Sequence, residues 1–85
     1  MGELNKLPNI GKALEKRLNE VDIVTKDELL SLGSKEAFKK LREVDGGACL
    51  NSLCALEGAV QGIRWHYLPK EVKNDLKEFL NSLEV

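Results

Sequence analysis

The 85-residue sequence predicts an all-α fold, a compact five-helix bundle with a helix-hairpin-helix-like turn that forms a single domain over residues 1–85. Apolar residues recur at helical spacing in five segments, and no segment shows the alternation of β-branched and polar residues that marks a strand. A chain of this length buries only about 60–65% of its unfolded surface, which leaves room for one core. Hydrophobic residues make up 42% and charged residues 32%, as is typical of a folded domain.

The first element is a turn, Leu7-Pro8-Asn9-Ile10-Gly11, that leads into a helix starting near Ile10. Proline fixes its own φ, asparagine tolerates a left-handed backbone, and glycine allows another group to approach the chain closely. The apolar residues of this helix fall within one narrow arc and its lysines point the other way. The two sets are Ile10, Leu14, Leu18 and Val21, against Lys12 and Lys16.

Two short helices are predicted next, separated by Gly33. Thr25 and Glu28 have the spacing of a capping box for a helix over Lys26–Leu32, which Gly33 is expected to end. Ser34 is expected to cap the following helix. The buried stripe of that helix is Ala37, Phe38, Leu41 and Val44.

The fourth predicted helix, from about Ala48 to Ile63, differs from the others because apolar or small residues cover most of its circumference. We expect it to be central, with small residues that let another helix approach its backbone: Ala55, Gly58, Ala59 and Gly62. Residues 64–67 form a linker, and Pro69 suits the first position of a fifth helix. The inward residues of that helix are Val72, Leu76, Phe79, Leu80 and Leu83.

Charge and hydropathy exclude two classes of protein. Thirteen basic and fourteen acidic residues give a net charge of −1, which excludes a globally basic nucleic-acid binder but permits local basic patches. No stretch approaches the roughly 20 apolar residues of a membrane helix, and the first residues lack the order of a signal peptide. We therefore expect a cytoplasmic protein without a membrane partner.

The motifs of enzymes and metal sites are missing from the sequence. It has no glycine-rich phosphate loop, no nucleophile elbow and no His/Cys/Asp cluster at metal spacing. Cys49 and Cys54 lie on one predicted helix and turn about 140° apart, so we expect reduced, buried thiols without metal. His66 is expected to be a packing or surface residue. These observations favour a binding protein over an enzyme, with no cofactor.

Several residues around the end of the fourth helix are predicted to be structural. Glu57 lies on a helix that should be largely buried and so needs polar partners, one of which Arg64 could provide as a clamp that fixes the linker. Gly58 and Gly62 belong to the same structural group. Trp65 and Tyr67 could offer a stacking platform for bases or an anchor for a protein partner. We expect Trp65 in the core and leave Tyr67 open.

The turn at Leu7–Lys12 resembles the hairpin of a helix-hairpin-helix motif, and is still more similar to the Pro-Asn-hydrophobic-Gly-Lys turn in the carboxy-terminal domain of the bacterial RNA polymerase alpha subunit. In those relatives the turn backs onto DNA phosphates. Free N–H groups at a helix start bind anions, and nearby lysines add charge. The candidate DNA contacts are Asn9, Ile10, Gly11, Lys12 and Lys16. The alternative is a turn that only packs helices together.

The order of segments over nearly the whole chain resembles the carboxy-terminal domain of the TfoX (Sxy) family of competence regulators, in its stand-alone version. The segments are Leu7-Pro8-Asn9-Ile10-Gly11, Val24–Leu29, Leu32–Phe38, Cys49-Leu50, Ala55–Ala59, Gly62–Trp65 and Leu68-Pro69. For the longer members, the resemblance implies regulation of DNA-uptake genes. It carries over no catalytic residues.

Two functions follow as hypotheses. The first is a non-enzymatic regulatory binding module, associated with transcription or competence-type regulation, that contacts DNA weakly through Leu7–Lys16. RNA polymerase or another transcription regulator would then supply most of the affinity. The second is a protein-interaction domain without DNA binding, whose working surface includes Lys39, Lys40 and Tyr67 or a homodimer contact. An exposed apolar patch away from the hairpin would favour the second, and the oligomeric state stays open.

Overall fold

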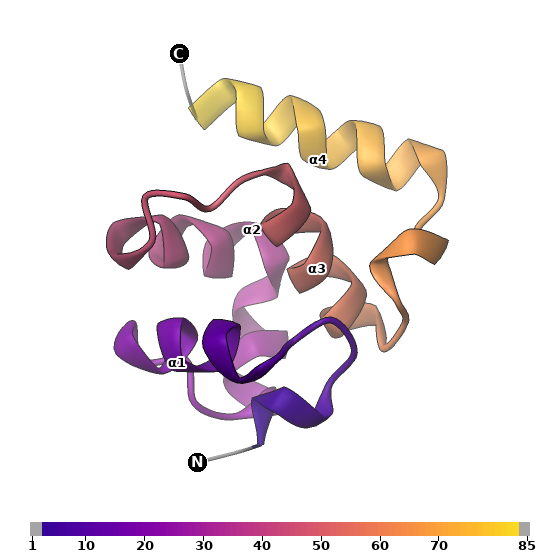
Figure 1. Ribbon diagram of the computed structural model, residues 1–85. Helices are drawn as coiled ribbons and strands as arrows, with labels where there is room; N and C mark the ends of the chain where they lie inside the picture. The colour runs from indigo at the N-terminus through magenta and orange to yellow at the C-terminus, as the bar shows by residue number, and fades with distance from the viewer. Residues whose placement is uncertain (1–2, 84–85) are drawn as a thin grey trace.

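The computed structural model describes residues 3–83, and within that range the chain forms four α-helices, two short 3-10 turns and no strand (Figure 1). The all-α prediction is confirmed. In chain order the elements are η1 (Leu4–Lys6), α1 (Lys12–Glu20), α2 (Lys26–Val44), α3 (Leu50–Gln61), η2 (Trp65–Tyr67) and α4 (Lys70–Leu83).

The predicted count of five helices is wrong, because the second and third predicted helices are one element, α2. Gly33 does break the helical geometry, with φ 79° and ψ 166°. Glycine adopts this left-handed φ without steric cost, so the chain changes direction within a single residue and resumes its helical turns at once. The break was therefore predicted at the right place, and the two predicted helices meet there across a kink within the single element α2.

A capping box starts α2, as predicted. The Thr25 hydroxyl accepts a hydrogen bond from the Glu28 N–H at 3.1 Å, and the Glu28 carboxylate accepts the N–H groups of Val24 and Thr25 at 2.9 Å each. These backbone hydrogen bonds lower the pKa of Glu28. The Lys26 N–H donates to the Glu3 carboxylate at 2.9 Å, which ties the first described residue to the same helix start.

Helix α3 is the central helix, as predicted, although it is shorter than expected at both ends. Figure 1 shows it in the middle of the molecule, with α4 on one side and the turn before α1 on the other. We call this turn, residues 7–11, the hairpin. Its buried residues are Leu53, Cys54, Ala55, Leu56, Gly58 and Ala59. The helix ends at Gly62, whose φ is 79°. A side chain at Gly62 would meet open space, so this glycine is needed for its backbone conformation and not, as we expected, for close helix packing.

Helix α4 covers the core with an amphipathic face. Only Leu76 is fully buried, while the other predicted inward residues are half-buried and packed against the core: Val72, Phe79, Leu80 and Leu83. Each helix within residues 3–83 is too short or too polar to span a bilayer.

Candidate nucleic-acid interface

The hairpin before α1 is a tight turn built on a left-handed asparagine. Asn9 has φ 70°, a conformation that asparagine tolerates better than most residues. The Ile10 side chain is only 4% exposed and belongs to the core, so its backbone alone could meet a ligand. The turn therefore has a buried side, held by Ile10, and an exposed side at Gly11 and Lys12.

The side chain of Asn9 faces the protein and ties the hairpin to the end of α3. Its Nδ2 donates hydrogen bonds to the carbonyl oxygen of Ile63 at 2.9 Å and of Ala55 at 3.4 Å. Its Oδ1 accepts a hydrogen bond from the Trp65 N–H at 3.1 Å. Asn9 is one of the predicted DNA contacts, but its side-chain amide is hydrogen-bonded inside the fold.

The absence of a side chain at Gly58 leaves room for the Asn9 side chain and its hydrogen bonds, which we call the Asn9 clamp. A β-carbon at residue 58 would collide with the Asn9 amide and would lie 2.7 Å from the Ile63 carbonyl oxygen and 3.1 Å from the Trp65 Cα. The groups that approach Gly58 closely are thus an asparagine side chain and a loop, not another helix as we expected.

The start of α1 is open to solvent. Gly11 is the N-cap residue and provides no side-chain cap, and within residues 3–83 the amides of Lys12 and Ala13 find no acceptor. A side chain at Gly11 would meet no atom within 4 Å. Lys12 and Lys16 are exposed, and neither takes part in an ion pair within that range. Free helix amides thus lie at the start of α1 beside Lys12, and Lys16 follows one helical turn later.

Glu15 holds the segment before the hairpin, a role that sequence reasoning missed. It is 7% exposed, and its carboxylate accepts the Leu4 N–H at 2.9 Å, the Asn5 N–H at 3.3 Å and the Asn5 side-chain amide at 3.0 Å. The N-cap residue of η1 makes no side-chain hydrogen bond, so the Glu15 carboxylate takes over the role of a cap by accepting the N–H groups at the start of this turn. The only signal in the sequence was an acidic residue beside the apolar arc of α1.

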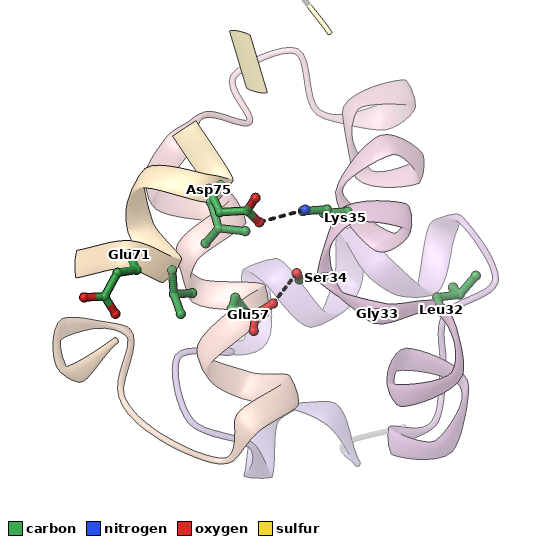
Figure 2. Close-up of a pocket in the computed structure, with 9 residues that line it drawn as sticks. Leu32, Gly33, Ser34, Lys35, Glu57, Glu71 and Asp75 are labelled. Atoms are coloured by element: carbon green, nitrogen blue, oxygen red, sulfur yellow. Dashed lines mark hydrogen bonds and ion pairs between the residues drawn. The ribbon is translucent and has the colours of Figure 1, made fainter. Parts of the chain in front are cut away.

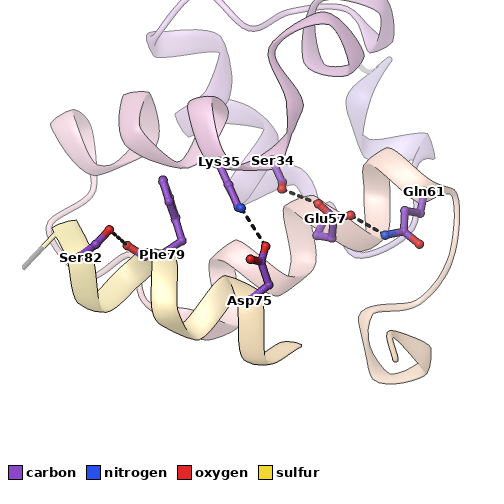
Figure 3. Close-up of polar contacts among 7 residues, drawn as sticks. All are labelled: Ser34, Lys35, Glu57, Gln61, Asp75, Phe79 and Ser82. Carbon is purple, nitrogen blue, oxygen red and sulfur yellow. Dashed lines mark hydrogen bonds and ion pairs between the residues drawn. The ribbon is translucent and has the colours of Figure 1, made fainter. Parts of the chain in front are cut away.

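Glu57 is part of a clamp, but not the clamp we predicted. The Ser34 hydroxyl donates to one Glu57 oxygen at 2.5 Å, and the Gln61 side-chain amide donates to the other (Figure 3). Arg64 is exposed and makes no ion pair with Glu57. The prediction fails because α3 ends at Gln61 and the left-handed Gly62 turns the chain before Arg64. Ser34, expected as a helix cap, instead joins the kink of α2 to α3.

A groove of about 540 Å³ lies beside this clamp, between the kink of α2, α3 and the first half of α4 (Figure 2). Its apolar lining comes from Leu32, Val72 and Leu76. An ion pair of 2.8 Å between Lys35 and Asp75 joins α2 to α4 across it. The groove does not include any residue of the hairpin.

The residues predicted for protein interaction have different surroundings. Tyr67 is 77% exposed, the most exposed of the large hydrophobic side chains in residues 3–83. Lys39 and Lys40 are also exposed, but Lys39 is paired with Glu36 at 3.2 Å. Trp65 is half-buried and packed against the core, whereas we expected it in the core itself.

The two thiols face different environments. Cys54 is buried, which raises its pKa, whereas Cys49 is exposed at the N-cap of α3. Both are free. The expectation that both are buried is wrong for Cys49, because α3 begins one residue after it. No group of three or more His, Cys, Asp or Glu side chains in residues 3–83 is arranged to hold a metal ion.

The family model of the TfoX C-terminal domain matches residues 1–80 of this chain. The chain belongs to the TfoX C-terminal domain family. Protein Sxy of Escherichia coli K12 is 36% identical over 80 residues, which cover 94% of this chain and 38% of Sxy. The chain thus spans less than two fifths of that relative.

Two crystal structures from Listeria monocytogenes have the same fold. An uncharacterized protein in a triclinic form is 53% identical, with a TM-score of 0.93 over 98% of this chain and 94% of that one. A protein of unknown function in a tetragonal form is also 53% identical, with a TM-score of 0.89 over 93% of this chain and 98% of that one. The family resemblance stated from the sequence is confirmed.

Proposed function

We propose that this TfoX C-terminal domain is a non-enzymatic regulatory binding module, associated with transcription or competence-type regulation, that contacts DNA weakly through Leu7–Lys16. The observation that carries the proposal is the uncapped, solvent-open start of α1 beside Lys12 and Lys16. Family membership supports the regulatory role, and the clamp at Asn9 holds the turn in one shape before any ligand arrives.

Free amides at a helix start point outward and carry a partial positive charge, which suits a phosphate oxygen. Gly11 suits this contact because it puts no side chain between the backbone and the ligand. Lys12 and Lys16 add charge without having to break an ion pair within residues 3–83. Such contacts read the DNA backbone and not its bases, so binding is independent of sequence.

The affinity of this site alone is low for two reasons. The net charge is −1, so no long-range field attracts DNA. The Glu15 carboxylate also lies in the first turn of α1, where it offsets part of the positive potential. A partner such as RNA polymerase or another transcription regulator would raise the effective concentration of DNA and supply most of the binding energy.

Fluorescence anisotropy with a labelled DNA duplex tests the proposal. We expect a Kd of about 10⁻⁴–10⁻⁶ M at physiological salt and a log–log salt slope of about −2 to −4, because few phosphates are neutralised. Replacing both Lys12 and Lys16 with Ala should flatten the slope by up to about 2. Gly11→Val should abolish binding, and its melting temperature shows whether the fold survives.

The matched control is the double substitution of Lys39 and Lys40 with Ala, which removes the same charge from the outer face of α2. It should leave both the affinity and the salt slope nearly unchanged. Absence of binding at low salt, or binding that survives the loss of Lys12 and Lys16, would contradict the proposal.

A second candidate, a protein-interaction domain without DNA binding, is favoured by apolar side chains exposed away from the hairpin. These are Tyr67 at 77%, Leu30 at 41% and Val24 at 37%. A pull-down with and without nuclease separates the two candidates. Partners retained after nuclease treatment indicate direct protein contact, and partners lost indicate a DNA bridge.

A further inference from the structure

The turn that joins α3 to α4 presents an exposed aromatic ring among several basic side chains. Tyr67, at 77% exposed, is the only tyrosine of the protein, and four basic side chains come from the same ten residues, 64–73. They are Arg64, His66, Lys70 and Lys73. We call the five residues together the η2 surface. No part of it is used by the hairpin proposal.

The geometry of η2 brings these groups together. The Tyr67 N–H donates to the Arg64 carbonyl oxygen at 3.0 Å, which closes the 3-10 turn. Arg64 is the N-cap residue of this turn and Lys70 begins α4, so both cations come from within three residues of Tyr67. His66 stacks on Trp65, with 4.2 Å between ring centroids and 27° between planes. The Lys73 ammonium lies 5.7 Å from the Trp65 ring centroid.

Within the part of the chain that the structure describes, no ion pair neutralises the basic charge of this turn. The ion pairs within residues 3–83 join Arg17 to Glu20, Lys35 to Asp75 and Lys39 to Glu36, so none involves the η2 surface. Glu71 is the one acidic residue in the segment 64–73, and it lines the groove on the side of α2 and α3. A protein with a net charge of −1 thus carries a local excess of positive charge around an exposed ring.

We propose that the η2 surface binds a single strand of nucleic acid, with an unpaired base stacked on the Tyr67 ring and phosphates beside Arg64 and Lys70. Base stacking on aromatic side chains combined with a cationic track is how proteins hold single strands without reading sequence. An acidic peptide would use the cations but not the ring, and an apolar partner would use the ring but leave the cations without counter-charges. A single strand uses both.

The surface lies next to the hairpin, because Asn9 hydrogen-bonds to the backbone at Ile63 and Trp65. The proposed function does not require the η2 surface, and the η2 surface does not require phosphate binding at α1. The two proposals therefore make separate predictions for duplex and single-stranded DNA.

Fluorescence anisotropy with a labelled oligothymidylate of about 15 nucleotides tests the inference, since single-strand sites span about 4–16 nucleotides. Tyr67→Ala should weaken binding by about 5- to 150-fold, which corresponds to the loss of one stacked base. Tyr67→Phe keeps the ring and should bind within about twofold of the unaltered protein. Because Tyr67 is exposed, neither variant should change the melting temperature.

Two further probes make the test specific. An oligonucleotide of the same length with abasic sites keeps the phosphates and lacks the bases, so it should bind the unaltered protein about as weakly as oligothymidylate binds Tyr67→Ala. The single tryptophan, Trp65, is two residues from Tyr67 and provides an independent signal. Its fluorescence should change on addition of oligothymidylate but not of a polyglutamate peptide of equal charge.

Equal binding of oligothymidylate to Tyr67→Ala and to the unaltered protein would overturn the inference, as would equal binding of the abasic strand. A response to polyglutamate as strong as that to oligothymidylate would also overturn it and indicate an acidic protein partner. If Lys12 and Lys16 prove irrelevant to duplex binding while Tyr67→Ala still loses the single strand, the hairpin proposal fails and this inference stands.

Discussion

The hairpin region and α4 are attached to the same core in different ways. The hairpin is held by polar side chains that reach backbone groups far away in the sequence, namely Asn9 to residues 55, 63 and 65 and Glu15 to residues 4 and 5. Helix α4 is held by one fully buried residue, Leu76, by half-buried apolar residues, and by an ion pair whose side chains are 42% and 61% exposed. Polar clamps specify one geometry, whereas an apolar face tolerates small shifts.

This difference matters for function because the hairpin carries the proposed DNA contact. A turn that presents backbone amides to a phosphate must hold them in place before the ligand arrives, otherwise ordering the turn would weaken binding. Removing a clamp should therefore be far more damaging than removing the ion pair on α4. The free energies of unfolding of variants at each contact test that ranking.

Gly58→Ala should destabilise the protein by about 3 kcal/mol, although alanine is the better helix former. The added β-carbon would collide with the Asn9 amide and the Ile63 carbonyl, so the hairpin would have to leave α3. Urea denaturation gives the value. Gly62→Ala is the matched control in the same chain segment and should cost only about 1–2 kcal/mol, because it introduces left-handed strain without a collision. Similar values for the two variants would contradict the clamp.

Asn9→Ala should cost about 2–3 kcal/mol, since it leaves the Trp65 N–H and the Ile63 carbonyl without a partner and places alanine at φ 70°. Asn9→Gly removes the same side chain but adopts this φ freely, so it should recover about 1 kcal/mol of that loss. Thermal melts of both variants measure the two contributions. If Asn9→Gly is as stable as the unaltered protein, the hydrogen bonds contribute nothing.

Glu15→Gln should cost about 1–2 kcal/mol, because an amide has one acceptor oxygen where the carboxylate uses two. Amide hydrogen exchange should show faster exchange at Leu4 and Asn5, the two backbone donors. Glu20→Gln, an exposed change on the same helix, is the control and should leave both amides protected.

Replacing both Lys35 and Asp75 with Ala should change the free energy of unfolding by less than about 1 kcal/mol. Water stabilises two exposed charges almost as well as they stabilise each other. Urea denaturation measures the change. A larger loss would mean that α4 depends on polar contacts as strongly as the hairpin does, and the comparison between the two regions would fail.

Much of the fold followed from short-range patterns in the sequence. Thr25 and Glu28 start α2, Gly33 breaks it, and the apolar spacing of α1 and α4 places Leu18 and Leu76 in the core as predicted. Each of these signals acts over a few residues of backbone, so no tertiary contact is needed to interpret it. The helix count was wrong because these signals are local. A glycine indicates where a helix breaks, but not whether helical turns resume at the next residue.

The candidate site was predictable only in part. The exposed lysines of α1 and the open glycine before it were found from amphipathic spacing and turn chemistry. The roles of Asn9 and Glu15 were not, because their partners lie 10 to 56 residues away, and Glu57 likewise has one distant partner, Ser34, 23 residues away. An asparagine in a turn predicts a left-handed backbone, but not the carbonyl groups that its side chain will meet.

By itself the sequence determined an all-α domain, its capped and broken helices, the apolar faces and the family. Three features became clear only from the packed chain: Asn9 turns inward, Ser34 and Gln61 take the place we assigned to Arg64, and Tyr67 is left in solvent. The physical reason is that helix formation and amphipathic burial depend on neighbours in sequence. A buried polar group is instead satisfied by whichever donor or acceptor the packed chain brings within hydrogen-bonding distance.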